Sequence, residues 1–146
     1  MSNIPTGFAK QQTPTLTYKY ISVTDQPNGI HVVKFVKATP EALKDLVAYQ
    51  SILVKSVPAD QVIRQLHDYH VGLPPISLAI REIRRLAAEP EFAIRSYRIA
   101  LIYPRRQQVL MQPLTTLFRM AQIRNIKTRA FPEQEYNIAT AWLLTD

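Results

Sequence analysis

The strongest indication of the fold class is the segment Tyr97-Arg98-Ile99-Ala100-Leu101-Ile102-Tyr103, which is followed directly by Pro104. Apolar residues fill it almost without interruption. A run of this length is typical of a central strand in a parallel sheet, where both faces of the strand are covered.

The segments on either side of this run alternate between strand and helix patterns. Before it, residues 61–71 have a strand pattern, and a helix with apolar residues at helical spacing is predicted from Ser77, whose side chain suits the N-cap. Glu89-Pro90 is expected to end that helix. After the run, a helix is predicted to start close to Pro113, followed by a strand over residues 126–131 and a last helix opened by Pro132-Glu133.

Toward the N-terminus, a strand that begins near Thr15 and a second one over residues 30–36 are separated by a turn over residues 25–29, which predicts a hairpin. Thr39 and Pro40 suit the N-cap and first position of a helix. The apolar stripe of that helix is interrupted only by Gln50.

The predicted order is ββαβαβαβα in a single α/β domain, with a mixed, mainly parallel sheet and helices packed against it. The 146 residues are enough for one core. Residues 1–14 are polar, contain two prolines and lack periodicity, so they are expected to form a flexible N-terminal tail, and residues 15–146 to form the domain.

Composition excludes several classes of protein. No apolar stretch approaches the roughly 20 residues of a membrane span, and the N-terminus lacks the apolar core of a signal peptide. The absence of cysteine excludes a disulfide framework and fits a cytoplasmic location. The glycines, Gly7, Gly29 and Gly72, lie too far apart for a dinucleotide-binding turn or a phosphate loop.

The formal net charge of +7 predicts attraction of anionic partners at low salt. Every arginine lies at or after Arg64. A basic patch is predicted from side chains in the C-terminal half, which would suit nucleic acid or a phosphorylated small molecule; its candidate members are Arg105, Arg106, Arg119, Arg124, Lys127 and Arg129.

Three residues are candidates for a ligand or partner site. Asp68 is expected at the carboxyl end of a parallel strand, the edge where α/β folds bind ligands. Ser77 is expected at the positive end of a helix, with Arg81 one turn along, which would suit a phosphate or carboxylate.

Catalytic machinery is not recognisable in the sequence. There is no nucleophile elbow, no cysteine–histidine pair and no tight carboxylate cluster, so an enzyme is not expected. His67 and His70 would point to opposite faces of one strand, so no metal site and no cofactor are predicted.

The order of elements, together with residues 98–104, resembles the STAS-like family, which is named for sulphate transporters and anti-sigma-factor antagonists. The more divergent bacterial members look closest, because they combine such a strand with a closing pattern like Phe131, Ala139 and Trp142-Leu143. The resemblance covers roughly residues 15–144 and implies a regulatory module that binds another protein.

Regulatory STAS domains carry an Asp-Ser-Ser/Thr-Gly motif where the second helix begins, and its serine is phosphorylated. Here that region reads Leu73-Pro74-Pro75-Ile76-Ser77-Leu78, without the aspartate and the glycine. The sequence therefore predicts a non-enzymatic interaction module without the phosphoserine switch. The alternative is an anion-binding module that acts through the basic patch, and the oligomeric state stays open.

Overall fold

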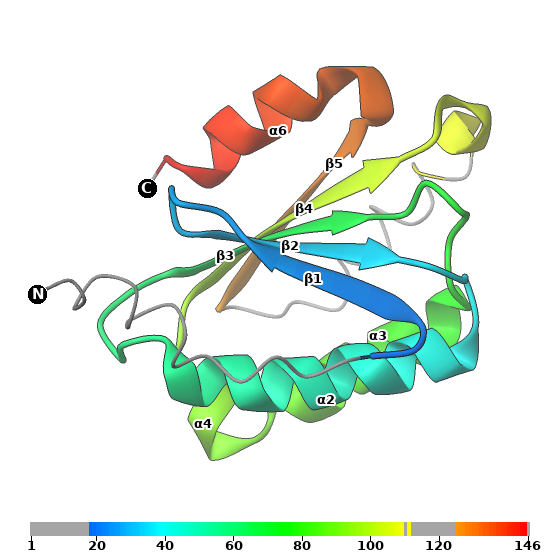
Figure 1. Cartoon of the computed structure of the whole chain (residues 1–146). Coiled ribbons are helices and arrows are strands. Elements are labelled where there is room, and N and C mark those ends of the chain that lie inside the picture. Colours follow the sequence, from blue (N-terminus) through cyan, green and yellow to red (C-terminus); the bar gives the residue numbers. More distant parts are fainter. Residues whose placement is uncertain (1–17, 110, 112–124, 146) are drawn as a thin grey trace, which may run out of the picture.

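The computed structural model describes residues 18–109, 111 and 125–145. Their five strands form one sheet in the order β1-β2-β3-β4-β5 (Figure 1). β1 (Ile21–Asp25) is antiparallel to β2 (Ile30–Phe35), whereas β3 (Ile63–Asp68), β4 (Tyr97–Tyr103) and β5 (Ile126–Pro132) continue the sheet parallel to β2. The predicted hairpin and the mixed, mainly parallel sheet are confirmed, but β1 begins at Ile21, later than the start near Thr15 that the sequence predicts. The predicted tail lies outside the described residues.

Helices cover both faces of the sheet. α2 (Pro40–Ser56), α3 (Ile76–Ala87) and α4 (Pro90–Ala93) lie on one face, and α6 (Tyr136–Leu143) lies on the other (Figure 1). Two short 3-10 turns, η1 (Arg105–Gln107) and η2 (Glu133–Glu135), follow β4 and β5. Pro113 falls outside the described residues, but Gln108, Val109 and Met111 are helical, so helical structure begins before the predicted start near Pro113. The exact order ββαβαβαβα stays a prediction.

α2 begins as the sequence predicts. The Thr39 hydroxyl accepts a hydrogen bond of 3.4 Å from the backbone N–H of Ala42, and Pro40 occupies the first turn, where its missing N–H costs nothing. The helix buries one stripe that includes Leu43, Leu46 and Leu53.

α3 begins earlier than predicted. Its N-cap residue is Pro75, which makes no side-chain capping hydrogen bond, and Ser77 is already the second helical residue. The prediction that Ser77 caps this helix is therefore wrong. Ile76 packs against the cluster formed by Tyr103 and Met111, and this contact accompanies the earlier start of the helix. Beyond the end of α3, Pro90 opens a further helical turn, α4, which the sequence analysis did not predict.

Two apolar cores form, one on each face of the sheet. On the side of α2 and α3, Val33, Phe35, Ile63 and Leu101 are buried among the helices. On the side of α6, the buried residues are Ile30, Leu66, Ala100, Ile102, Phe131, Ala139 and Leu143. β4 supplies residues to both cores, so the prediction of a central strand covered on both faces is confirmed. Among the described residues, no helix is both long and apolar enough to cross a membrane.

Candidate functional site

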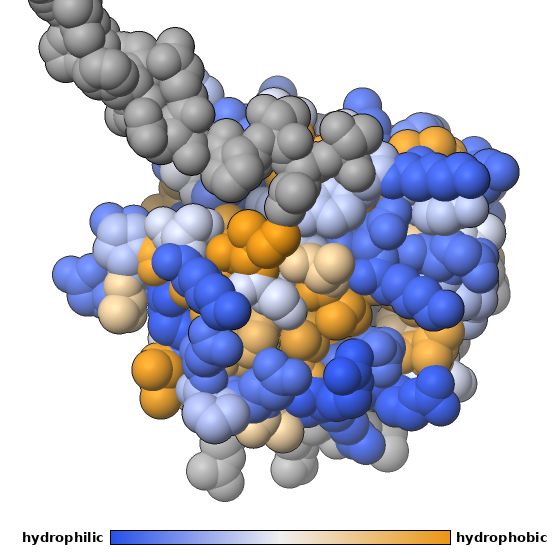
Figure 2. Space-filling view, turned by 60° about the horizontal axis from the view of Figure 1, so that its bottom comes forward, coloured by the Kyte–Doolittle hydropathy of each residue, from blue (hydrophilic) through white to orange (hydrophobic). Residues whose placement is uncertain are grey.

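A pocket of about 320 Å³ lies where α2 and α3 pack on β3, β4 and β5, and we call it the apolar pocket. Its walls are mostly aliphatic and include Leu43, Leu46 and Val47 on α2, Ile83 and Leu86 on α3, and Ile99 and Leu101 on β4. Figure 2 turns this side of the molecule forward and shows apolar side chains in the middle, bordered by hydrophilic ones.

The middle of β4 is incompletely buried on the side that faces the pocket. Ile99 is partly exposed, although Arg98 and Ala100 on either side of it are buried. Thr128, its register partner on β5, is also partly exposed and lines the same pocket. The strand that is otherwise the most buried therefore leaves one apolar side chain available at the pocket.

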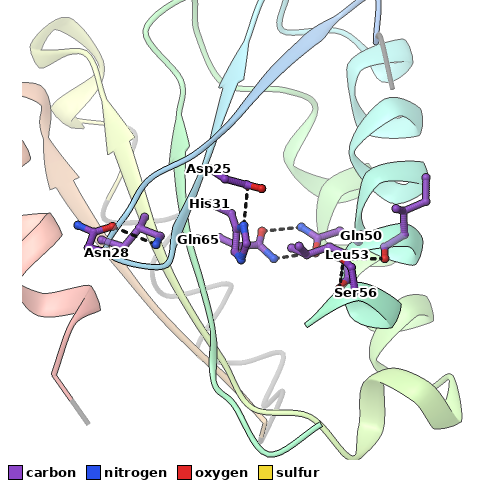
Figure 3. A network of polar contacts seen from close by, with 9 residues as sticks. Asp25, Asn28, His31, Gln50, Leu53, Ser56 and Gln65 are labelled. Atoms are coloured by element: carbon purple, nitrogen blue, oxygen red, sulfur yellow. Dashed lines mark hydrogen bonds and ion pairs between the residues drawn. The ribbon is translucent and has the colours of Figure 1, made fainter. Parts of the chain in front are cut away.

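Two amides and a histidine meet beside the pocket. Gln50 projects from α2 toward Gln65 on β3, and the two side chains exchange hydrogen bonds of 2.6 and 2.7 Å (Figure 3). His67, also on β3, lies 2.7 Å from the same Gln65 oxygen through its Nε2 atom. Gln50, His67 and Tyr69 line the pocket, so its wall contains a connected group of buried polar side chains.

The hydrogen bonds assign the tautomer of His67. Because the Gln65 oxygen accepts, Nε2 of His67 carries the proton and donates it, and Nδ1 is left as the acceptor. The Tyr69 hydroxyl lies 3.4 Å from Nδ1 and can donate only a weak bond. Burial lowers the pKa of His67 to about 3 and raises the pKa of Tyr69. This group is therefore neutral at neutral pH.

Tyr97 adds a polar atom that has no hydrogen-bond partner among the described residues. It lines the pocket from the start of β4, is 4% exposed, and stacks on Phe92 with ring centroids 6.2 Å apart. Its hydroxyl is buried and makes no hydrogen bond among the described residues. Burial raises the pKa of Tyr97 to about 12, against a smaller opposing effect of Arg95. A buried hydroxyl without a partner is costly, which makes this atom a candidate contact for a bound molecule.

Two charged residues contribute to the pocket lining, and both have other contacts. Glu82 on α3 pairs with Arg85 at 2.8 Å, and this hydrogen bond and charge lower the pKa of Glu82. Arg129 on β5 places its guanidinium 4.8 Å from the centre of the Phe131 ring. Phe131 belongs to the core on the α6 side, so this guanidinium is directed toward the opposite face of the sheet.

The structure separates the three candidate site residues. Asp68 ends β3, accepts a 3.0 Å bond from the backbone N–H of His70, and lines a second pocket of about 360 Å³ with Lys34 and Tyr136 on the α6 side. Ser77 and Arg81 are exposed on α3, which covers the other face. The prediction that these residues serve a ligand or partner stays untested, with Asp68 apart from the other two.

The basic patch is only partly described. Arg105 and Arg106 lie in η1, beyond the carboxyl end of β4, and Arg106 donates to the carbonyl of His70 at 3.1 Å. Lys127 and Arg129 lie on β5, where Lys127 is the register partner of Arg98 near the start of both strands. Arg129 lies in the middle of β5 as the register partner of Ala100, whereas Arg105 and Arg106 follow the carboxyl end of β4, and the patch stays a prediction. Arg119 and Arg124 fall outside the described residues.

The histidines do not converge. His67 is buried in the amide network, whereas His70 is exposed and its Nδ1 atom lies 3.5 Å from Asp68. In the part of the chain that the structure describes, no group of three or more histidine, aspartate or glutamate side chains is placed to share a metal ion.

The chain was compared with protein-family models, curated proteins and solved structures, and none of them matches it.

Proposed function

We propose that this chain is a non-enzymatic regulatory binding module and that its apolar pocket holds a small, mostly apolar molecule. One observation carries the proposal: mostly aliphatic walls line a partly open pocket of about 320 Å³ beside buried polar side chains. This volume lies at the lower end of the range of about 300–1,000 Å³ for small-molecule pockets, which are mainly apolar with a few placed polar groups.

The chemistry of the pocket favours binding over catalysis. Gln50 and Tyr97 hold no readily transferred proton at neutral pH, and both ring nitrogens of His67 face partners within the network. With a pKa of about 3, His67 is a weak base, far from the value near the working pH that suits a general base.

α3 offers a physical link between the pocket and a protein partner. Ile83 and Leu86 line the pocket, whereas Ser77 and Arg81 are exposed on the same helix. A ligand that shifts or stiffens α3 would change the surface presented to a partner, as expected of a regulatory module that resembles STAS domains. Membership of that family is part of the proposal.

A fluorescent probe and two matched tryptophan variants test the proposed pocket. Nile red, an uncharged dye that brightens in apolar surroundings, is titrated into the protein, into Ile99→Trp and into Ile138→Trp. The first variant fills the pocket, and the second places the same bulk on the exposed side of α6, on the opposite face. We expect Ile99→Trp to lower the affinity at least tenfold and Ile138→Trp to leave it unchanged.

Equal dye binding by all three proteins, each checked for folding by circular dichroism, would reject the pocket as the site. The regulatory part is tested separately by pull-down from native lysate at two salt concentrations, with analysis of both protein and nucleic acid. A protein partner retained at moderate salt supports the module, whereas nucleic acid lost steeply as salt rises supports the anion-binding alternative.

A further inference from the structure

The apolar pocket also restricts the charge of its ligand. We infer that it takes an uncharged molecule with an apolar body and one neutral polar group, such as a hydroxyl, a carbonyl or an amide, which pairs with Gln50 or Tyr97. This inference rests on the proposed function and names the chemical class of the ligand.

Unused hydrogen-bonding capacity in the pocket lining matches a neutral polar group. Gln50 is 7% exposed, and its bonds with Gln65 use one amide hydrogen and one acceptor position of its oxygen. A side-chain amide has two hydrogens and two acceptor positions, so one of each remains. The unpaired Tyr97 hydroxyl can also donate or accept. A single alcohol or carbonyl satisfies either residue without bringing a charge into the pocket.

A charged ligand would need a counter-charge, and the described lining does not provide one. Glu82 is paired with Arg85, and Arg129 lies over Phe131. The nearby Arg95 is buried and is not part of the described pocket lining. Its two terminal nitrogens donate to the backbone carbonyls of Val54, Pro58 and Gln61, and its Nε has no partner among the described residues.

Protonation of His67 does not supply the missing charge either. Its Nε2–H is committed to Gln65, and burial holds its pKa at about 3. A carboxylate or ammonium group among these residues would lose its hydration without gaining an ion pair, which is strongly unfavourable. The lining therefore discriminates by charge as well as by shape.

Three ligands with the same ten-carbon chain test this inference. 1-Decanol, decanoate and decylammonium compete with Nile red at pH 7.4, each below the concentration at which it forms micelles. We expect 1-decanol to displace the dye at a concentration at least tenfold lower than either ion. In Ile99→Trp, 1-decanol should displace the dye less well, because the tryptophan side chain fills the pocket in which 1-decanol would bind.

Two conservative variants locate the polar contact. Tyr97→Phe removes only the buried hydroxyl, and Tyr136→Phe makes the same change on the α6 side as a matched control. Gln50→Leu removes the amide. We expect Tyr97→Phe or Gln50→Leu to lower the affinity for 1-decanol at least threefold, and Tyr136→Phe to leave this affinity unchanged. If neither Tyr97→Phe nor Gln50→Leu changes the affinity for 1-decanol, the assigned polar contact is wrong.

The possible failures are distinguishable. If decanoate or decylammonium competes as well as 1-decanol, and Ile99→Trp weakens that competition, the pocket binds ligands and the inference about charge is wrong. If Ile99→Trp leaves both dye binding and competition unchanged, the proposed pocket fails, and the inference fails with it.

Discussion

Gln50 on α2 and Gln65 on β3 are joined by two reciprocal amide hydrogen bonds at the place where the helix packs on the sheet. Both side chains are buried, and Gln65 is 0% exposed. The pair lies beside the apolar core between helix and sheet, and the side-chain oxygen of Gln65 also accepts from His67. It thus fixes the position of α2 over β3 while it leaves polar atoms of Gln50 at the pocket.

This arrangement predicts a large energetic coupling between the two glutamines. Gln65→Leu leaves the amide of Gln50 and the Nε2–H of His67 without their partner, and we expect the free energy of unfolding to fall by about 1–3 kcal/mol. Gln50→Leu should cost a similar amount because it strands the Gln65 amide. The double variant should cost less than the sum of the single variants by about 1–2 kcal/mol, since it removes both amides together.

Urea unfolding followed by circular dichroism measures all four proteins of this cycle. Additive effects within about 0.3 kcal/mol would show that the two amides do not depend on each other.

His67 predicts a loss of stability in acid. In the unfolded chain this histidine has a pKa near 6.5, whereas burial lowers its pKa to about 3 in the folded protein. The unfolded state therefore binds more protons between these values, and the contribution of His67 is complete above pH 6.5 and is lost as the pH falls toward 3. The slope approaches about 1.4 kcal/mol per pH unit within this window.

The free energy of unfolding is measured at pH 7.5 and at pH 5, for the protein and for His67→Gln. The glutamine of this variant cannot titrate, but it keeps an N–H group that can donate to Gln65. We expect the variant to have the weaker pH dependence. His31→Gln, at a partly exposed histidine paired with Asp25 at 2.7 Å, serves as a second comparison. Identical pH profiles for the protein and His67→Gln would contradict the buried neutral histidine.

Local patterns in the sequence predict much of the architecture. The apolar run at residues 97–103 gave the bounds of β4, and Thr39-Pro40 marked the start of α2, because both signals depend on neighbouring residues alone. The start of α3 was missed because a capping signal at Ser77 competed with the packing of Ile76 against Tyr103, a residue far along the chain.

The pocket was not predictable in the same way, because its lining comes from helices and strands that only the fold brings together. One signal was present: Gln50 interrupts an apolar helical stripe, which indicates a buried polar residue in need of a partner. Its partner Gln65 lies fifteen residues away on β3, and no local pattern joins the two. The unpaired hydroxyl of Tyr97 depends on its whole surroundings and has no signature in the sequence.

Arg98 is predicted to stabilise the end of α6. It is 7% exposed, donates at 3.0 Å to the carbonyl of Trp142 and at 3.0 Å to the hydroxyl of Thr145, and lies 4.2 Å from the centre of the Trp142 ring. The Trp142 carbonyl also accepts from the backbone N–H of Thr145 at 3.2 Å, so Arg98 adds a charged donor and a ring contact at the negative end of the helix. We expect Arg98→Met to lower the free energy of unfolding by about 2–3 kcal/mol.

Arg129→Met is the matched control, because Arg129 is exposed and its guanidinium lies over the face of Phe131. Its expected cost is below about 1 kcal/mol. Hydrogen exchange should show faster opening of α6 in Arg98→Met alone. Equal losses in the two variants would mean that the contacts of Arg98 with α6 contribute little.

The last prediction compares two hydroxyl residues at the starts of two helices. Thr39 caps α2 through its hydroxyl, so Thr39→Ala should cost about 1 kcal/mol. Ser77 lies inside α3 and makes no capping bond, so Ser77→Ala should change the free energy of unfolding by less than about 0.5 kcal/mol. Ser77→Asp should be neutral or slightly stabilising, because it places a negative charge in the first helical turn. Thermal and urea unfolding of the three variants measure these differences. A loss of 1 kcal/mol or more in Ser77→Ala, equal to that in Thr39→Ala, would restore Ser77 as a cap and contradict the start of α3 at Ile76.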